Sequence, residues 1–135
     1  MHEWALAEAV IRTASQIAEK EGLTEVTEVN IRLGELQQVD IDIFKFALSQ
    51  LKTRELGKAQ FNIRKAEAKL LCRVCNHEWL FSAAELDEEA REAVHFIPEI
   101  AHTFMKCPRC SSPDFEILSG RGVWIESIKG VKNHD

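Results

Sequence analysis

The apolar positions of the first 21 residues recur at the spacing of a helix. Val10, Ala14 and Ile17 lie three or four residues apart, which places them on one helical face. Gly22 follows, and helices commonly end at a glycine in this position. We therefore predict an amphipathic helix over residues 2–21 whose apolar face packs on a core.

The period of the pattern then changes from helical to alternating. Val29, Ile31 and Leu33 alternate with polar residues, which predicts a half-buried strand over residues 26–33. We predict further strands around residues 61–63 and over residues 123–128.

A second helix is predicted between the first two strands. Asp40 or Asp42 can cap its start, Phe44 and Leu48 supply its apolar face, and Gly57 is expected to close it. Helices and strands in this order predict an α+β fold, with two helices packed on a small three-stranded sheet.

The middle of the chain has a different character. It begins and ends with a Cys-X-X-Cys pair, and a capping-box pattern from Ser82 to Glu85 predicts a helix that runs to Ile97 before Pro98. Because the flanking segments complete one sheet, we interpret residues 70–111 as an inserted module. The first domain then comprises residues 1–69 and 112–135.

The composition is that of an ordinary globular protein, with 45% hydrophobic and 29% charged residues. The start of the chain lacks the basic and apolar regions of a signal peptide, and no apolar run reaches the length of a membrane span. We therefore expect a cytoplasmic protein with reduced thiols and no membrane partner.

The two cysteine pairs predict one zinc site. Two residues between cysteines allow a tight turn to present both sulfurs to one tetrahedral ion, and two such turns complete a four-thiolate shell. A closed shell leaves no position for substrate, so this zinc-ribbon module is expected to be structural. The predicted zinc ligands are Cys72, Cys75, Cys107 and Cys110.

Redox-active pairs, a disulfide and an iron–sulfur cluster are the alternatives for these cysteines. A nucleic-acid partner is disfavoured because the net charge is −5 and residues 70–111 carry seven acidic but only four basic residues. We find no phosphate loop, nucleotide fingerprint or catalytic triad, so we predict that the protein is not an enzyme. A zinc-ribbon adaptor that binds only protein and an unrecognised metalloenzyme remain as alternatives.

The start of the chain offers a second set of metal donors. The amine of Met1, the imidazole of His2 and backbone nitrogens of the first helical turn can reach one ion, and Glu3 adds a carboxylate beside them. Nitrogen donors in a plane suit Ni(II) or Cu(II). An exposed terminal histidine without a ligand role is the simpler alternative.

Two histidines of the middle block are candidates for a further donor. His95, at the end of the predicted helix, is preferred over His102. A packed or solvated side chain is the simpler reading of each.

Several motifs together resemble the HypA family of nickel-incorporation chaperones for [NiFe]-hydrogenase maturation. They are Met1-His2-Glu3-Trp4-Ala5-Leu6, Gly34-Glu35-Leu36, the two cysteine pairs with Cys107 to Ser112 as Cys-Pro-X-Cys-X-Ser, and residues 122–128. The 31 residues between Cys75 and Cys107 resemble the long, archaeal form of the family.

The resemblance implies a nickel domain split by a zinc module, with His2 as an essential nickel ligand. It also implies nickel handover with the GTPase HypB and delivery to the hydrogenase large subunit. Whether urease is also served, and whether the protein forms a homodimer, the sequence leaves open.

Overall fold

The computed structural model describes residues 2–82 and 86–132, apart from the side chains of His2 and Pro98. The chain divides into two compact units, which we describe separately. The first comprises Met1–Arg32, Val39–Arg64 and Val123–Asp135, and the second comprises Leu33–Gln38 and Lys65–Gly122. The second unit thus includes more of the chain than the residues 70–111 that we predicted as the zinc-binding module.

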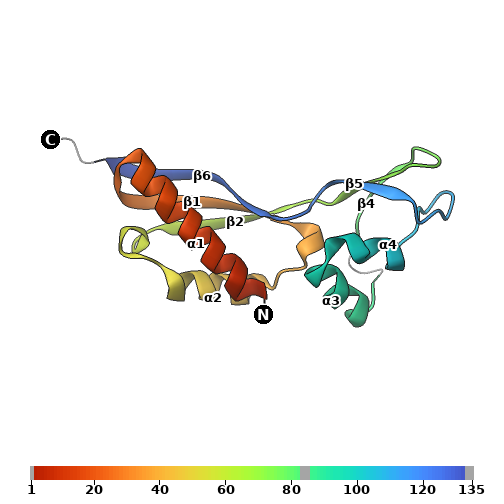
Figure 1. Ribbon diagram of the computed structural model, residues 1–135, viewed down its shortest axis with the longest axis horizontal. Coiled ribbons are helices and arrows are strands. Elements are labelled where there is room, and N and C mark those ends of the chain that lie inside the picture. Colours follow the sequence, from red (N-terminus) through yellow and green to blue (C-terminus); the bar gives the residue numbers. More distant parts are fainter. Residues whose placement is uncertain (1, 83–85, 133–135) are drawn as a thin grey trace. The chain divides into compact units, whose positions relative to one another are not determined.

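The first unit combines two helices with most of a three-stranded sheet. β1 is the central strand of the sheet, and α1 packs against α2 and β6 (Figure 1). The elements are α1 (His2–Glu21), β1 (Leu23–Gly34), α2 (Ile41–Leu51), the 3-10 helix η2 (Arg54–Leu56), β2 (Gln60–Ala66) and β6 (Val123–Lys132).

The core of this unit includes apolar residues of the helical and alternating patterns that predicted α1 and β1. Val10 and Ala14 of α1 are buried, and so are Val29 and Ile31 of β1. α1 has the predicted bounds, whereas all three strands extend beyond the predicted segments.

Asp40 caps α2, as one of the two predicted alternatives. Its Oδ1 accepts a hydrogen bond from the Ile43 N–H at 3.1 Å. The prediction that Gly57 closes this helix is wrong, because α2 ends at Leu51 and Gly57 instead follows the separate 3-10 helix η2.

The second unit contains a second three-stranded sheet and two short helices. Its strands lie in the order β4-β3-β5, and β3 pairs antiparallel with both neighbours, so that Leu70 faces Trp79 on one side and Ile117 on the other. The elements are η1 (Glu35–Gln37), β3 (Lys69–Cys72), β4 (Glu78–Leu80), α3 (Glu88–Phe96), η4 (Pro98–Ile100), α4 (Ala101–Phe104) and β5 (Phe115–Ser119).

The core of the second unit lies between this sheet and the helices. Leu70 and Phe115 supply its sheet side, and Val94 supplies its α3 side. The other buried members of this cluster are Leu36, Ala68, Phe81, Leu86, Ala90, Ala101 and Met105.

The helix predicted over Ser82 to Ile97 begins later than predicted. Asp87 is the N-cap of α3, and its Oδ1 accepts the Ala90 N–H at 2.7 Å. Ser82 lies in a loop, and the rest of the predicted capping box, residues 83–85, lies outside the described residues. Asp87 rather than Ser82 therefore caps the start of α3, and Pro98 follows the end of this helix as predicted.

The predicted fold class is confirmed. The described residues form an α+β structure with a three-stranded sheet, its helices and a four-cysteine cluster in the intervening part of the chain. None of the described helices combines the length and the apolar character needed to cross a bilayer.

Gly34, the last residue of β1, makes a close backbone contact with the segment that follows β5. The Gly34 N–H donates to the Gly122 carbonyl at 2.7 Å, and the Leu36 N–H donates to the Gly120 carbonyl at 2.9 Å. A Cβ atom at Gly34 would lie 2.3 Å from the Gly120 carbonyl oxygen. Because that neighbour is backbone, it cannot rotate away, and only glycine fits without a shift of the chain.

We expect Gly34→Ala to destabilise the protein by about 1–3 kcal/mol, the usual cost of overpacking a filled site. Denaturant unfolding followed by circular dichroism measures this change. Gly57→Ala is the matched control, because Gly57 has helical backbone angles that alanine adopts readily, and it should stay within about 1 kcal/mol of wild type. Equal stabilities of the two variants would contradict the steric argument.

Candidate metal sites

The first Cys-X-X-Cys pair forms a tight turn directly after β3. The Cys72 N–H donates to the His77 carbonyl at 2.8 Å, and the Asn76 N–H donates back to the Cys72 carbonyl at 3.0 Å. Asn76 has a positive φ of 63°, a conformation that asparagine tolerates better than most residues. These bonds hold the turn in a fixed shape.

The second pair repeats this construction. The Cys107 N–H donates to the Ser112 carbonyl at 2.9 Å, and the Ser111 N–H donates to the Cys107 carbonyl at 2.8 Å. Ser111 has a φ of 65°, close to that of Asn76 in the first turn. The two turns are therefore structural equivalents from distant parts of the sequence.

The four sulfur atoms of these turns converge. Cys72 Sγ lies 3.5 Å from Cys110 Sγ, and Cys75 Sγ lies 3.7 Å from Cys107 Sγ. All four ligand atoms lie within 4.8 Å of one another. Since a tetrahedral ion with metal–sulfur bonds of about 2.3 Å needs sulfur–sulfur separations of about 3.8 Å, the donor set fits one metal ion.

Backbone N–H groups point at two of the four sulfurs and favour the thiolate form of Cys72. The Cys75 and Val74 N–H groups point at Cys72 Sγ at 3.5 and 3.4 Å, and their hydrogen bonds lower the pKa of the Cys72 thiol to about 7. The Arg109 N–H lies in the same way 3.4 Å from Cys107 Sγ. The Ser112 N–H lowers the pKa of Cys110, but the neighbouring sulfurs and partial desolvation of its own sulfur outweigh it and raise that pKa, although the residue as a whole is exposed. Metal binding would relieve this crowding of sulfurs.

Aromatic rings pack behind the cysteine turns. His77 stacks on Trp79, whose ring contacts Phe115 edge-on at 5.5 Å. His102 is the second candidate for a further nickel donor. Its ring centroid lies 4.0 Å from that of Phe115, and its Nδ1 is 3.1 Å from the Pro113 carbonyl oxygen. These contacts place His102 in the packing of the second unit.

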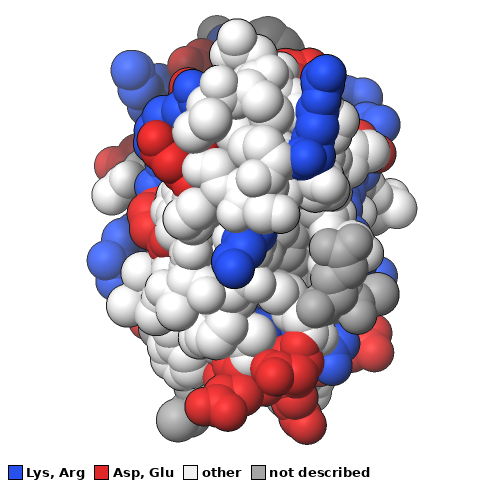
Figure 2. Space-filling view, turned by 90° about the vertical axis from the view of Figure 1, so that its right-hand side faces the viewer, with Lys and Arg blue, Asp and Glu red and all other residues white. Residues whose placement is uncertain are grey.

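The outer surface of the second unit is acidic at one end. Figure 2 shows a cluster of acidic side chains at the lower end of this face, with basic and further acidic side chains scattered over the rest. The exposed carboxylates around the hollow beside α3 are those of Asp87, Glu88, Glu89 and Glu92.

The second predicted donor set lies at the start of α1. His2 is the first residue of the helix, whereas its side chain and the whole of Met1 lie outside the described residues. Glu3 is buried, and its Oε2 accepts the Asp40 N–H at 3.0 Å. The same Asp40 caps α2, so one residue fixes both the Glu3 carboxylate and the start of the neighbouring helix.

His95 lies in the second unit, in the last turn of α3. Its side chain is buried, and its Nδ1 is hydrogen-bonded to the Gln37 carbonyl. Gln37 is held in turn, because its Oε1 accepts the Gly122 N–H at 3.1 Å. A carbonyl can only accept, so this contact places the proton of a neutral His95 on Nδ1.

Sequence analysis did not identify Gln37 and Asp40 as residues that position site side chains. Both act through backbone atoms toward residues that are distant in sequence, and no side-chain pattern reports such contacts. The only available signal was the adjacent Gly34-Glu35-Leu36 motif, which precedes both residues.

Comparison with known proteins identifies the family. The sequence matches the family described as "Hydrogenase/urease nickel incorporation, metallochaperone, hypA" over residues 1–130. The chain belongs to the HypA family. It is 45% identical over 132 residues to the hydrogenase maturation factor HypA of Pyrococcus abyssi and 47% identical over 132 residues to that of Pyrococcus horikoshii. Each alignment covers 96% of this chain and 95% of the relative.

The fold agrees with that of solved HypA structures. The solution structure of the Ni metallochaperone HypA from Helicobacter pylori matches with a TM-score of 0.64 at 17% identity, covering 97% of this chain and 98% of the other. A second solution structure of a HypA protein matches with a TM-score of 0.62 at 20% identity. The resemblance noted from the sequence motifs is therefore confirmed, and the chain is a member of a family of hydrogenase maturation factors and nickel metallochaperones.

Proposed function

We propose that this protein binds Ni(II) at the start of α1 and delivers it during [NiFe]-hydrogenase maturation. Membership of the HypA family over residues 1–130 is the observation that carries this proposal. The start of α1 at His2 supports it, because the N–H groups of a first helical turn have no intrahelical acceptor and can give up a proton to a metal.

The proposed ligands are the Met1 amine, the His2 imidazole and backbone nitrogens of the first turn. Such a planar nitrogen set favours Ni(II) over Zn(II), which prefers a tetrahedron. Glu3 contributes its anchored carboxylate, either to the ion directly or as a nearby negative charge. The hydrogen bond from the Asp40 N–H holds that carboxylate within the first turn of α1.

We propose His95 as a further nickel ligand through Nε2. Its Nδ1 contact with the Gln37 carbonyl leaves Nε2 as the nitrogen with the metal-binding lone pair, which is the usual arrangement of a ligating histidine. Only two residues separate Gln37 from Asp40. The covalent chain keeps these two backbone anchors within about 10–11 Å of each other.

His95→Ala is expected to lower nickel affinity about 10- to 100-fold and to change the nickel absorption spectrum, while zinc content stays at wild-type level. Isothermal titration and metal analysis measure both. His102→Ala is the matched control, since His102 packs on Phe115 within the second unit. A nickel absorption spectrum of His95→Ala identical to that of wild type would contradict the proposal and leave His95 with a packing role only.

We further propose that the four-cysteine site holds one structural zinc ion. The sulfur separations and the inward-facing N–H groups support this, and a closed thiolate shell leaves no open coordination position. A zinc ion in such a shell would have no catalytic role, and we propose that the protein acts by binding and transfer.

The proposed partners are a HypB-type GTPase and the large subunit of the hydrogenase. Transfer can be tested by mixing ⁶³Ni-loaded protein with the GTPase and the purified large subunit and separating the proteins by gel filtration. With wild-type protein, ⁶³Ni radioactivity should appear in the large-subunit fraction. The His2→Ala variant should bind no ⁶³Ni and should therefore transfer none. Nickel that stays on the wild-type protein with both proposed partners present would contradict delivery.

A further inference from the structure

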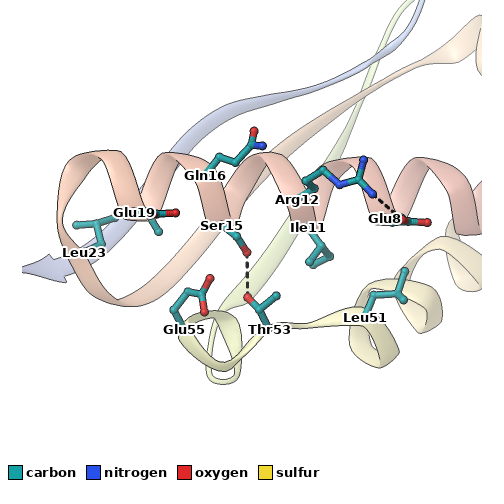
Figure 3. A pocket seen from close by; sticks show the side chains of 11 residues that line it. Glu8, Ile11, Arg12, Ser15, Gln16, Glu19, Leu23, Leu51, Thr53 and Glu55 are labelled. Atoms are coloured by element: carbon teal, nitrogen blue, oxygen red, sulfur yellow. Dashed lines mark hydrogen bonds and ion pairs between the residues drawn. The ribbon is translucent and has the colours of Figure 1, made fainter.

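A groove of about 650 Å³ runs beside α1 from Glu8 to Glu19 in the first unit. One wall is α1 itself, and the other is the end of α2 with the segment that follows it (Figure 3). This groove involves none of the proposed nickel or zinc ligands. Its lining residues are Glu8, Ile11, Arg12, Ser15, Gln16, Ala18, Glu19, Leu23, Leu51, Thr53 and Glu55.

The bottom of the groove is apolar. Ile11 and Ala18 are buried there, and Leu23 and Leu51 are half-buried at its two ends. This apolar surface offers no hydrogen bonds to water. An aliphatic side chain that displaces the water therefore binds with a favourable free energy.

The sides of the groove carry excess negative charge. Three glutamates line it against one arginine, and that arginine, Arg12, is already paired with Glu8 at 2.8 Å. Glu19 and Glu55 remain as carboxylates along the groove. The C-terminal end of α1 adds the negative partial charge of the helix dipole.

Glu55 is held in place at the middle of this wall. Ser15 Oγ and Thr53 Oγ1 are hydrogen-bonded across the groove at 2.9 Å, and Figure 3 shows the Glu55 carboxylate beside them. Its own backbone N–H and these two hydroxyls lower the pKa of Glu55, so it is ionised at neutral pH. The basic residues Arg54 and Lys58 line a separate hollow on the other side of Glu55.

We propose that this groove is a docking site for a short segment of a partner protein in which Arg or Lys stands beside Leu or Ile. The charge complementarity of Glu19 and Glu55 selects the basic side chain, and the apolar floor selects its aliphatic neighbour. A small cation alone would leave Leu23 and Leu51 exposed to water, whereas a protein segment covers them as well.

The proposal is tested with a phage-displayed library of random heptapeptides selected on the full-length, zinc-loaded protein. Enriched sequences should combine Arg or Lys with an adjacent aliphatic residue. Titration of the strongest synthetic peptide should show about two- to fivefold weaker binding to Glu55→Gln and to Glu19→Gln, the effect expected for a surface ion pair, and weaker binding at higher salt.

Glu21→Gln is the matched control, because it removes the same charge from an exposed position of the same helix outside the groove. It should bind like wild type, and circular dichroism should show all variants folded. Enriched peptides without basic residues, or equal affinity of all variants, would overturn the proposal. So would spermidine binding as tightly as the peptide, or a dimer in sedimentation velocity that Glu55→Gln dissociates.

Discussion

Replacing Cys107 by Ser is expected to abolish metal binding at the four-cysteine site and to unfold most of the second unit. Cys107 is buried, and its sulfur contacts Cys75 of the other turn. A metal bound there would link two turns with 31 residues between them, Cys75 and Cys107 being the nearest cysteines. Structural zinc contributes about 10–16 kcal/mol in small zinc-binding peptides, because metal binding there is folding free energy. The first unit has its own buried core and should remain folded.

Metal analysis and amide hydrogen exchange measure this result. Wild type should carry one zinc per chain, whereas the variant should carry none and should lose exchange protection in Leu70 and Phe115 but keep it in Val29. The control is Arg109→Ala, which alters an exposed side chain between the two cysteines of the same turn. Wild-type protein that contains no metal under reducing conditions, with unchanged protection, would refute a structural metal.

α1 and β1 of the first unit could be predicted because each has a clear period. α1 buries Val10 and Ala14 four residues apart, and β1 buries Val29 and Ile31 two residues apart. The ends of elements were harder to predict. Gly57 was assigned to α2 because glycine commonly ends helices, but the chain turns earlier, at Lys52, and forms a separate 3-10 turn first.

The second sheet was not predicted because its strands are short. β3 has four residues, β4 three and β5 five, and no alternation can be recognised over such lengths. Their pairing depends on contacts such as Leu70 with Ile117, 47 positions apart. Tertiary packing therefore determines this sheet, rather than any local pattern.

The candidate sites also differ in whether a local sequence pattern could identify them. The four cysteines were found from spacing alone, since Cys-X-X-Cys is a local pattern with a local geometry, and the structure brings all four together. The residues that orient the other candidates, Asp40 for Glu3 and Gln37 for His95, could not be found. Each acts through a backbone group across more than 30 positions of sequence.

Nickel affinity at the start of α1 is expected to fall steeply below neutral pH. A free α-amino group has a pKa of about 7.7–8.0 and an imidazole of about 6.5, and each must lose its proton before it binds a metal. Protons therefore compete with nickel for the Met1 amine and the His2 imidazole. Below both pKa values, affinity should fall up to about 100-fold per pH unit, and deprotonation of a backbone amide would steepen this further.

Isothermal titration of nickel between pH 6 and pH 8.5 measures the slope in wild type and variants. His2→Ala should lose at least about 100-fold in affinity at pH 7.5, and acetylation of the Met1 amine should flatten the pH dependence above pH 7. Intact-mass analysis establishes which residue carries the free amine. His134→Ala, which removes a histidine without a proposed role, should behave like wild type. Nickel affinity that responds neither to pH nor to His2→Ala would exclude a site at this helix start, because the Met1 amine and the His2 imidazole must both lose a proton before they bind.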